Sequence, residues 1–248
     1  MACTCKLSSG KQFVGLPGHL KPRILSGLSE ATLSDILSTA KHRQFMASSI
    51  VICEGDPADR FYLCTSGYGR HFYITSDGRK VLLHWLTAGQ IFGGAAMIST
   101  PVNYALNTEV VTDSCALVWS RQTIRDLVVR HPKILDNAFT IAATEHVGWW
   151  LAAHASLISD DAHGRIAHLL TSLASGIGKH TSGGVEIKIT NEDLAEGANV
   201  TPFTVSRSLS EWERAGLVKK HRGAVLLRKP ELLRSADQMF KLELRDKR

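Results

Sequence analysis

The sequence predicts an α+β fold in which a region of short strands, a long helix and a compact C-terminal unit follow one another. Three observations support this prediction. Between Phe45 and Trp119 the apolar runs are short and separated by glycines or by Asp-Gly. Residues 133–158 then carry apolar side chains at helical spacing. Residues 190–230 have the start and stop signals of two short helices followed by two strands.

The totals fit a globular protein. The chain has 248 residues, enough for one large domain or two modest ones, and 44% of them are hydrophobic, which argues against disorder. No apolar run reaches the roughly 18 residues that a membrane helix needs. The N-terminal stretch "MACTCKLSSG" lacks the apolar core of a secretory signal. We therefore expect a cytoplasmic protein.

The charge is concentrated near the C-terminus. The formal net charge is +6, and the isoelectric point is about 9.1. From Ile187 to the end there are 13 Lys or Arg and 9 Asp or Glu. This balance fits a C-terminal domain that faces nucleic acid, although a merely basic surface would show it as well.

The first 42 residues are expected to hold an arm and a helix. Residues 1–20 are rich in Gly, Ser and Lys, which predicts a loose arm. Residues 23–42 have helical spacing, and Ser29 with Glu30 suits a helix start. The apolar residues on one side of this predicted helix are Ile24, Leu25, Leu28, Leu33, Ile36 and Leu37.

The strand region has regular turn signals. Asp77-Gly78 lies between "HFYIT" and "KVLLHW" and predicts a hairpin, because both turn positions tolerate positive φ. Many short strands joined by regular turns indicate a barrel or roll. The glycines that recur at about the spacing of successive turns are Gly55, Gly67, Gly78 and Gly89.

The long helical stretch has a seven-residue repeat, which is typical of a helix packed on a partner helix. Packing on its own domain is the alternative. Asn137 and Thr144 interrupt the apolar stripe. The repeat consists of Ile134, Ile141, Gly148 and Ala155, with Leu151 and Ile158 at the complementary positions. A new unit begins at "ISDDAHGRIAHLL", where Asp160 or Asp161 can cap the next helix.

Residues 190–214 predict two helices joined by a tight turn. Thr190 or Asn191 can cap the short helix "EDLAEGA". Asn199 falls where the turn needs a left-handed residue, which Asn tolerates. Thr201 can cap the second helix, with Pro202 at its first position, where a missing N–H costs nothing.

The second helix has a buried and an outward side. Val205, Leu209 and Trp212 have the spacing of the buried side, and Arg207 projects outward with Thr204 and Ser206. In a helix-turn-helix the first turns of the second helix touch base edges. Arg can donate two hydrogen bonds to guanine. The sequence therefore predicts DNA binding, with an ordinary helical hairpin as the alternative.

The stretch "GLVKKHRGAVLLRKP" predicts two strands around Arg222-Gly223, a feature known as a wing. Lys219, Lys220 and Arg222 would then lie near the phosphate backbone.

With these motifs in place, the chain resembles the Crp/Fnr family of bacterial transcription regulators over nearly its whole length. The Gly-punctuated roll, the long helix, "HGRIAHLL" and "TVSRSL" come in the family's order. The resemblance implies a homodimer that places two recognition helices in successive major grooves of a pseudo-palindromic operator, with RNA polymerase as a further partner. It implies four parts: an arm (1–20), a cupin-like, cyclic-nucleotide-binding-like β-roll sensor domain (21–130), a dimerisation helix (131–159) and a winged helix-turn-helix (160–248).

The recognition helix departs from the family's pattern. Ser206 and Arg207 match the family's Ser-Arg, but Phe203 stands where a Glu is frequent, and Pro202 replaces the Arg of the cyclic-AMP-binding branch. Phe can pack on a thymine methyl but cannot accept a hydrogen bond from cytosine. The half-site of that branch is therefore not expected. The candidate DNA-binding residues are Thr201, Phe203, Thr204, Ser206, Arg207, Arg165, Lys219, Lys220 and Arg222.

The sensor pocket also departs from that branch. "QIFGGAAMISTPVNYALN" resembles its nucleotide-binding segment, but Gly94 replaces the Glu that holds the ribose, and Tyr104-Ala105 replaces the Arg-Ser that binds the phosphate. Losing the Arg removes a charge-assisted contact, so cyclic AMP is not expected. An apolar or aromatic effector at the roll–helix junction suits the residues present, with simple packing as the alternative for each Trp. The candidate pocket residues are Gly93, Gly94, Met97, Tyr104, Ala105, Trp149 and Trp150.

Haem and an iron–sulfur cluster are the cofactors to consider. Haem needs an axial ligand, and no spacing singles out one of the 11 His. A cluster needs four thiolates as a rule, and beyond Cys3, Cys5 and a distant Cys115 no fourth is assigned, so a cluster is not expected. With Cys53 and Cys64, the five cysteines are expected to be thiols, and a redox switch through Cys3 and Cys5 stays open. The candidate ligands are His71, His84, His146, His154, Cys3 and Cys5.

The leading functional hypothesis is a dimeric transcription regulator switched by a small effector. The alternatives are a regulator that is always competent to bind DNA and a haem-dependent gas or redox sensor. A cupin-type enzyme is a remote alternative, because the roll lacks a His-x-His pair with a later Glu and His. We therefore do not expect an enzyme.

Overall fold

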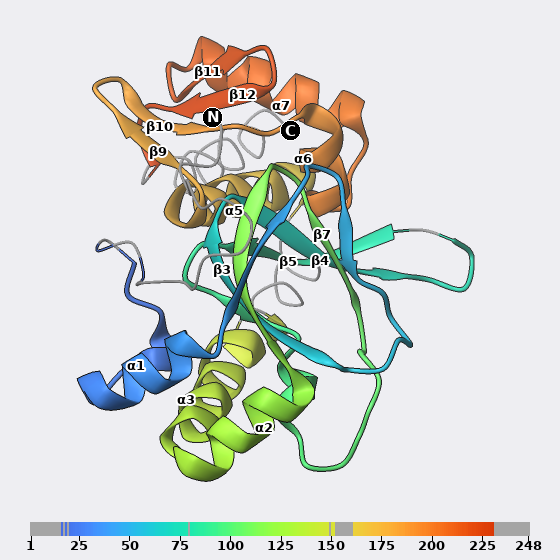
Figure 1. Ribbon diagram of the computed structural model, residues 1–248. Helices are drawn as coiled ribbons and strands as arrows, with labels where there is room; N and C mark the ends of the chain where they lie inside the picture. The colour runs from blue at the N-terminus through green and yellow to red at the C-terminus, as the bar shows by residue number, and fades with distance from the viewer. Residues whose placement is uncertain are drawn as a thin grey trace. The chain divides into compact units, whose positions relative to one another are not determined.

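The structure, a computed structural model, describes residues 16, 18, 20–78, 80–148, 150–151 and 161–230. These residues form two compact units, one N-terminal and one C-terminal (Figure 1). Most of the predicted arm and the residues after 230 lie outside the described part. No helix within that part is long and apolar enough to cross a bilayer.

The N-terminal unit is a roll of two four-stranded sheets (Figure 1). Their orders are β1-β8-β3-β6 and β2-β7-β4-β5. The strands are β1 (Lys41–Phe45), β2 (Ile50–Ile52), β3 (Arg60–Ser66), β4 (Tyr68–Ile74), β5 (Lys80–Thr87), β6 (Ile91–Phe92), β7 (Asn107–Val110) and β8 (Ser114–Ser120). Strands β3 and β8 pair antiparallel with Leu63 opposite Leu117, and both side chains are completely buried. The predicted roll is confirmed.

The recurring glycines lie where the backbone turns with positive φ. All four predicted turn glycines have φ between 78° and 92°, a range that Gly adopts without cost. Gly67, between β3 and β4, also allows a close approach, because a Cβ there would lie 2.2 Å from the Ser114 Oγ. Gly78 follows Asp77 in the predicted hairpin between β4 and β5.

The helix expected over residues 23–42 is wrong in length. The structure has a 3₁₀ turn, η1 (Arg23–Leu25), then α1 (Glu30–Ser38), and β1 already begins at Lys41. Gly27 separates the two helical pieces with a φ of 69°, and Ser29 restarts the helix by accepting a hydrogen bond from the Thr32 backbone N–H at 3.2 Å. The spacing of the apolar residues did not predict this break at Gly27.

Further helical segments follow the strands. They are the 3₁₀ turn η2 (Gly94–Met97), α2 (Arg121–Arg130), α3 (Lys133–Ile141) and the π-helical turn η3 (Ala142–His146). Trp119 at the end of β8 is buried, and its Nε1–H donates to the Ile36 carbonyl at 3.0 Å, which ties α1 to the roll.

The start of the long helical stretch packs on its own domain. Ile134 and Ile141 belong to the core that also holds Trp119 and Leu117. At these two positions the helix therefore packs on its own domain and not on a partner helix. Asn137, which interrupts the apolar stripe, is buried and donates to the Ile24 and Ser26 carbonyls at 2.9 Å each. The later repeat positions Ala155 and Ile158 lie outside the described residues.

The C-terminal unit has three helices and one four-stranded sheet of order β11-β12-β10-β9 in the described part (Figure 1). Its elements are α5 (Ala162–Gly176), β9 (Lys179–Thr181), β10 (Gly184–Ile187), α6 (Asn191–Ala198), α7 (Pro202–Arg214), β11 (Val218–His221) and β12 (Ala224–Leu227). The predicted helix-turn-helix is α6–α7, and the predicted wing is β11–β12, with Gly223 at a φ of 70°. The strands β9 and β10 were not predicted. The α+β fold class is confirmed.

Candidate DNA-binding surface and effector cavity

Local signals fix the helix-turn-helix. Thr190 caps α6 by accepting from the Asp193 N–H at 3.1 Å. Asn199 closes α6 in the left-handed region, with a φ of 51°. Thr201 caps α7 by accepting from the Thr204 N–H at 3.2 Å, and Pro202 occupies the first turn. The predictions for these positions are confirmed.

Helix α7 has the predicted buried side and an exposed side. Val205, Leu209 and Trp212 are at most 1% exposed. Phe203 is 78% exposed although it is aromatic, and Ser206 and Arg207 are exposed as well. An exposed aromatic side chain beside an exposed Arg, at the start of a capped helix, suits contacts with base edges.

A groove lies between α6, α7 and the wing. Its volume is about 330 Å³, and polar groups dominate its lining. This groove is lined by Ser206, by Asn191 at the first turn of α6 and by His221 on the wing, among other residues. A polar groove next to a helix start can receive a phosphate oxygen.

The wing is tied to α7 through Lys220. The Lys220 backbone N–H donates to the Glu213 carboxylate at 2.9 Å, and its Nζ lies 2.9 Å from the Ser210 Oγ and 3.3 Å from the other Glu213 oxygen. The backbone hydrogen bond is the main cause that lowers the pKa of Glu213. Lys219 and Arg222 are exposed.

Arg165 lies behind the turn. Its Nε–H donates to the Ala198 carbonyl at 2.9 Å, and its Nη2 lies 3.4 Å from the Asn199 carbonyl. These are end carbonyls of α6, which Arg side chains commonly bind. Arg165 therefore supports the turn, and a direct contact with DNA stays a prediction.

The predicted effector-pocket residues are scattered. Gly94 and Ala105 are exposed, and Trp150 is 60% exposed. Met97 is 2% exposed and belongs to the roll core. Trp149 lies outside the residues whose side chains are described. Gly93 has a φ of 70°, and a Cβ there would lie 2.7 Å from the Arg60 carbonyl.

Tyr104 is held by the backbone. Its hydroxyl donates to the Arg60 carbonyl at 2.7 Å and accepts from the Arg60 N–H at 3.0 Å. Burial raises the pKa of Tyr104 to about 12. The side chain that takes the place of the family's phosphate-binding Arg is thus a buried neutral group that joins two parts of the roll.

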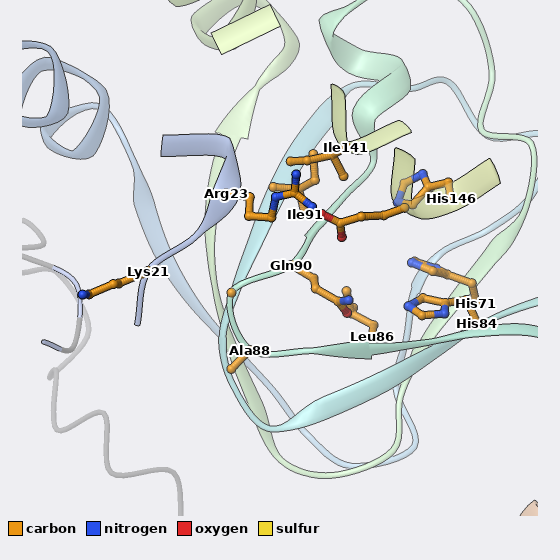
Figure 2. A pocket seen from close by; sticks show the side chains of 12 residues that line it. Lys21, Arg23, His71, His84, Leu86, Ala88, Gln90, Ile91, Ile141 and His146 are labelled. Carbon is orange, nitrogen blue, oxygen red and sulfur yellow. Dashed lines mark hydrogen bonds and ion pairs between the residues drawn. The ribbon is translucent and has the colours of Figure 1, made fainter. Parts of the chain in front are cut away.

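The N-terminal unit contains a different cavity, of about 190 Å³. Figure 2 shows the imidazoles of His71, His84 and His146 on one side of it, and Lys21 and Arg23 on the other. The remaining lining residues are Leu86, Ala88, Gly89, Gln90, Ile91, Ile141 and Glu145. The structure thus brings together three of the four His that the sequence offered as candidate ligands.

The cavity holds its imidazoles in the neutral form. Burial, with a smaller contribution from neighbouring imidazoles, lowers the pKa of His71 to about 4 and that of His84 to about 3. Burial also lowers the pKa of His146. The Nδ1 of His71 lies 2.9 Å from the buried Thr108 hydroxyl, and the rings of His71 and His84 stack at 6.4 Å. Neutral imidazoles can donate one hydrogen bond and accept another.

An ion pair contributes to the lining of the cavity. The Arg23 guanidinium in η1 contacts the Glu145 carboxylate in η3. Sequence reasoning had missed both residues and also Gln90, because they come from segments far apart in the chain and match no local motif. The sequence offered the three imidazoles as candidate ligands, but no local spacing placed them in one site.

The cofactor candidates form no metal site among the described residues, where no three His, Cys, Asp or Glu groups are placed to hold an ion. His154, Cys3 and Cys5 lie outside that part. Cys53 and Cys64 are free thiols, as expected, and burial raises the pKa of Cys64 to about 12. Cys115 is buried in β8, and its expected thiol state stays a prediction.

Two domain families match the chain. The Crp-like helix-turn-helix domain matches residues 164–236, and the cyclic nucleotide-binding domain matches residues 42–131. The second match covers the strands of the roll, although the Glu and Arg-Ser of the nucleotide-binding branch are absent.

Whole-length relatives agree with these matches. The CRP-like cAMP-activated global transcriptional regulator of Mycobacterium tuberculosis is 24% identical over 85% of this chain and 94% of its own length. The anaerobic regulatory protein of Bacillus subtilis is 24% identical over 84% and 89%. The fold is that of FixK2 from Bradyrhizobium japonicum, with a TM-score of 0.69, 20% identity, and coverage of 79% of this chain and 96% of that one. The chain belongs to the Crp/Fnr family of DNA-binding transcription regulators.

Proposed function

We propose that this chain is a cytoplasmic homodimeric transcription regulator, that it binds a pseudo-palindromic operator through α7, and that a small effector in the His-lined cavity controls it. The observation that carries the DNA-binding surface is the capped, exposed start of α7 with Phe203 and Arg207. RNA polymerase is the expected partner once the operator is bound.

The exposed apolar residues that follow the roll support a homodimer. Phe139 is 72% exposed, Trp150 60% and Leu151 65%. Side chains of this size are seldom left in water in such number along one helical stretch. A second copy of this chain is the simplest cover for them, and a two-fold dimer would place two recognition helices one turn of DNA apart.

The cavity supports an effector other than cyclic AMP. Tyr104, where the family places a phosphate-binding Arg, is engaged with the Arg60 backbone, and Gly94 offers no carboxylate to a ribose. The cavity volume of about 190 Å³ is below the roughly 300 Å³ at which pockets for drug-sized ligands begin. A compact ligand that hydrogen-bonds to neutral imidazoles fits this space.

Haem fits the donors but not the space. Neutral His is a common axial ligand of haem iron, and three such side chains border the cavity. Haem is larger than a drug-sized ligand, however, so it does not fit the cavity volume. An absorption spectrum and a native mass spectrum of the purified chain decide the point. We expect a colourless dimer, and a visible band with the mass of haem would overturn this conclusion.

DNA selection tests the main proposal. The wild-type chain is used to select operators from a random duplex library, and affinity is then measured for the operator and for unrelated DNA across a salt series. We expect a palindromic consensus and a steep loss of affinity with salt. The Arg207→Ala variant should lose roughly ten- to a hundredfold in operator affinity and little on unrelated DNA. Equal losses on both would show that Arg207 does not read a base.

The same assay separates the effector hypotheses. Cyclic AMP should leave operator affinity unchanged. A chain that binds its operator fully, without any added ligand and with no extra mass, would favour the effector-independent alternative.

A further inference from the structure

Glu211 connects Arg207 of the recognition helix to a second helix. One carboxylate oxygen of Glu211 lies 3.1 Å from the Arg207 Nε, and the other lies 3.2 Å from the His163 Nε2. Arg207 and Glu211 are four residues apart on α7, whereas His163 belongs to the first turn of α5. The carboxylate is thus held from outside the recognition helix.

His163 is itself fixed. The rings of His163 and Trp212 are nearly perpendicular, with centroids 5.6 Å apart and an interplanar angle of 89°, and Trp212 is completely buried. The start of α5 is set by Asp161, whose side chain accepts from the Gly164 N–H at 2.9 Å. The chain of contacts therefore runs from the core of the C-terminal unit to an exposed guanidinium.

This arrangement suits guanine recognition. The side chain of Arg207 is 70% exposed, and a free Arg side chain loses much rotamer entropy when it binds. A hydrogen bond at Nε restrains the guanidinium plane and leaves the distal N–H groups of the two terminal nitrogens to bind a base. Two parallel N–H groups are what the O6 and N7 of guanine accept.

We propose that Glu211 is a positioning residue that sets the specificity of Arg207 for guanine, and that His163 holds Glu211 in place. The proposal rests on the proposed role of Arg207 in reading a base. If Arg207 and Glu211 were an ordinary surface ion pair at i,i+4, the pair would contribute little to stability and nothing to the choice of base.

A double-mutant cycle tests the proposal. Wild type, Glu211→Ala, Arg207→Ala and the double variant are titrated with the selected operator and with operators in which each G·C pair is replaced. We expect Glu211→Ala to lower discrimination about three- to tenfold at the one base pair that Arg207 reads, and to have no further effect in the Arg207→Ala background. Affinity for unrelated DNA should not fall, because the substitution removes a negative charge from a DNA-facing surface.

Conservative variants separate positioning from folding. Glu211→Gln keeps an oxygen that can accept from the Arg207 Nε–H and should restore part of the discrimination. His163→Phe keeps a ring against Trp212 but removes the Nε2, so it should lower discrimination at the same base pair. Glu213→Ala is the matched control, since that carboxylate pairs with Lys220 and should leave discrimination unchanged.

The outcomes are distinct. Unchanged discrimination in Glu211→Ala, or an equal loss with and without Arg207, would overturn the proposal. If Arg207→Ala itself affects no particular base pair, the base-reading role of Arg207 fails, and this arm shows it independently of Glu211.

Discussion

The DNA-binding surface and the His-lined cavity are assembled in opposite ways. The surface comes from one continuous stretch, residues 190–223, in which Thr190 and Thr201 cap the helix starts and Asn199 ends α6. The cavity collects side chains from residues 21–23, 71, 84–91 and 141–146. Short-range sequence rules therefore specify the helix-turn-helix surface, whereas the His-lined cavity forms only when the roll folds.

The two regions also handle polar groups differently. On the candidate DNA-binding surface Arg207 and Lys220 are exposed to water and pair with the carboxylates of Glu211 and Glu213. In the cavity burial stabilises the neutral form of His71 and His84. Acid should therefore destabilise the roll before the C-terminal unit. Protonating a buried imidazole is unfavourable, whereas protonating an exposed one is not.

The largest expected effect is a loss of roll stability between pH 7 and pH 5. The pKa values of His71 and His84 are depressed, to about 4 and about 3, so the unfolded chain binds more protons below pH 6.5. The stabilisation is complete above that pH and falls as the pH drops toward 4. At pH 5 the free energy of unfolding should be lower by about 2 kcal/mol per imidazole.

Urea unfolding of the full chain at both pH values measures this change, with hydrogen exchange followed separately in peptides of β3 and of α7. Asp35, whose pKa is lowered from 3.8 mainly by a hydrogen bond to His131, titrates below this window and does not interfere. The His84→Gln variant should show a weaker pH dependence. A roll that unfolds at the same urea concentration at pH 7 and pH 5 would contradict the prediction.

Tyr104→Phe tests whether the family's phosphate-binding position has become structural. Removing the hydroxyl deletes two hydrogen bonds to the Arg60 backbone. The free energy of unfolding should fall by about 1–2 kcal/mol, as measured by urea denaturation without any ligand. A residue that only lined an effector site would leave the stability of the ligand-free protein unchanged.

The contrast between the two regions explains what the sequence could predict. The roles of Thr201 and Pro202 in starting α7, and of Asn199 in ending α6, could be predicted, because caps and left-handed turns depend on residue types a few positions apart. The roll followed from its Gly-marked turns in the same way. The break at Gly27 was missed, because apolar spacing continues across it.

The His-lined cavity could not be found by such rules. His71 faces His84 because β4 and β5 are neighbours in one sheet, and His146 joins them because η3 packs on the same unit. The residues carried over from the family, Gly94 and Ala105, are exposed instead. The resemblance pointed to residues 90–107, of which Gln90 and Ile91 line the cavity.

A smaller effect is expected for the cap of the recognition helix. Thr201→Ala removes the acceptor for the Thr204 N–H and should cost about 1 kcal/mol of stability in the C-terminal unit. Hydrogen exchange in α7 should rise while exchange in β3 stays unchanged. Thr201→Ser keeps the hydroxyl and serves as the control, and a rise in both units would show that the effect is not local.

The smallest effect concerns the two neighbouring Lys of the wing. The sequence assigns both Lys219 and Lys220 to phosphate contacts, but Lys220 is engaged with Glu213 and Ser210. Lys219→Met should therefore reduce the salt dependence of DNA affinity by about one phosphate contact. Lys220→Met should reduce it less, and should instead slightly weaken the attachment of the wing, as expected for an exposed ion pair. Equal salt slopes for the two variants would mean that Lys220 leaves Glu213 when DNA binds, and that the wing reorganises on the operator.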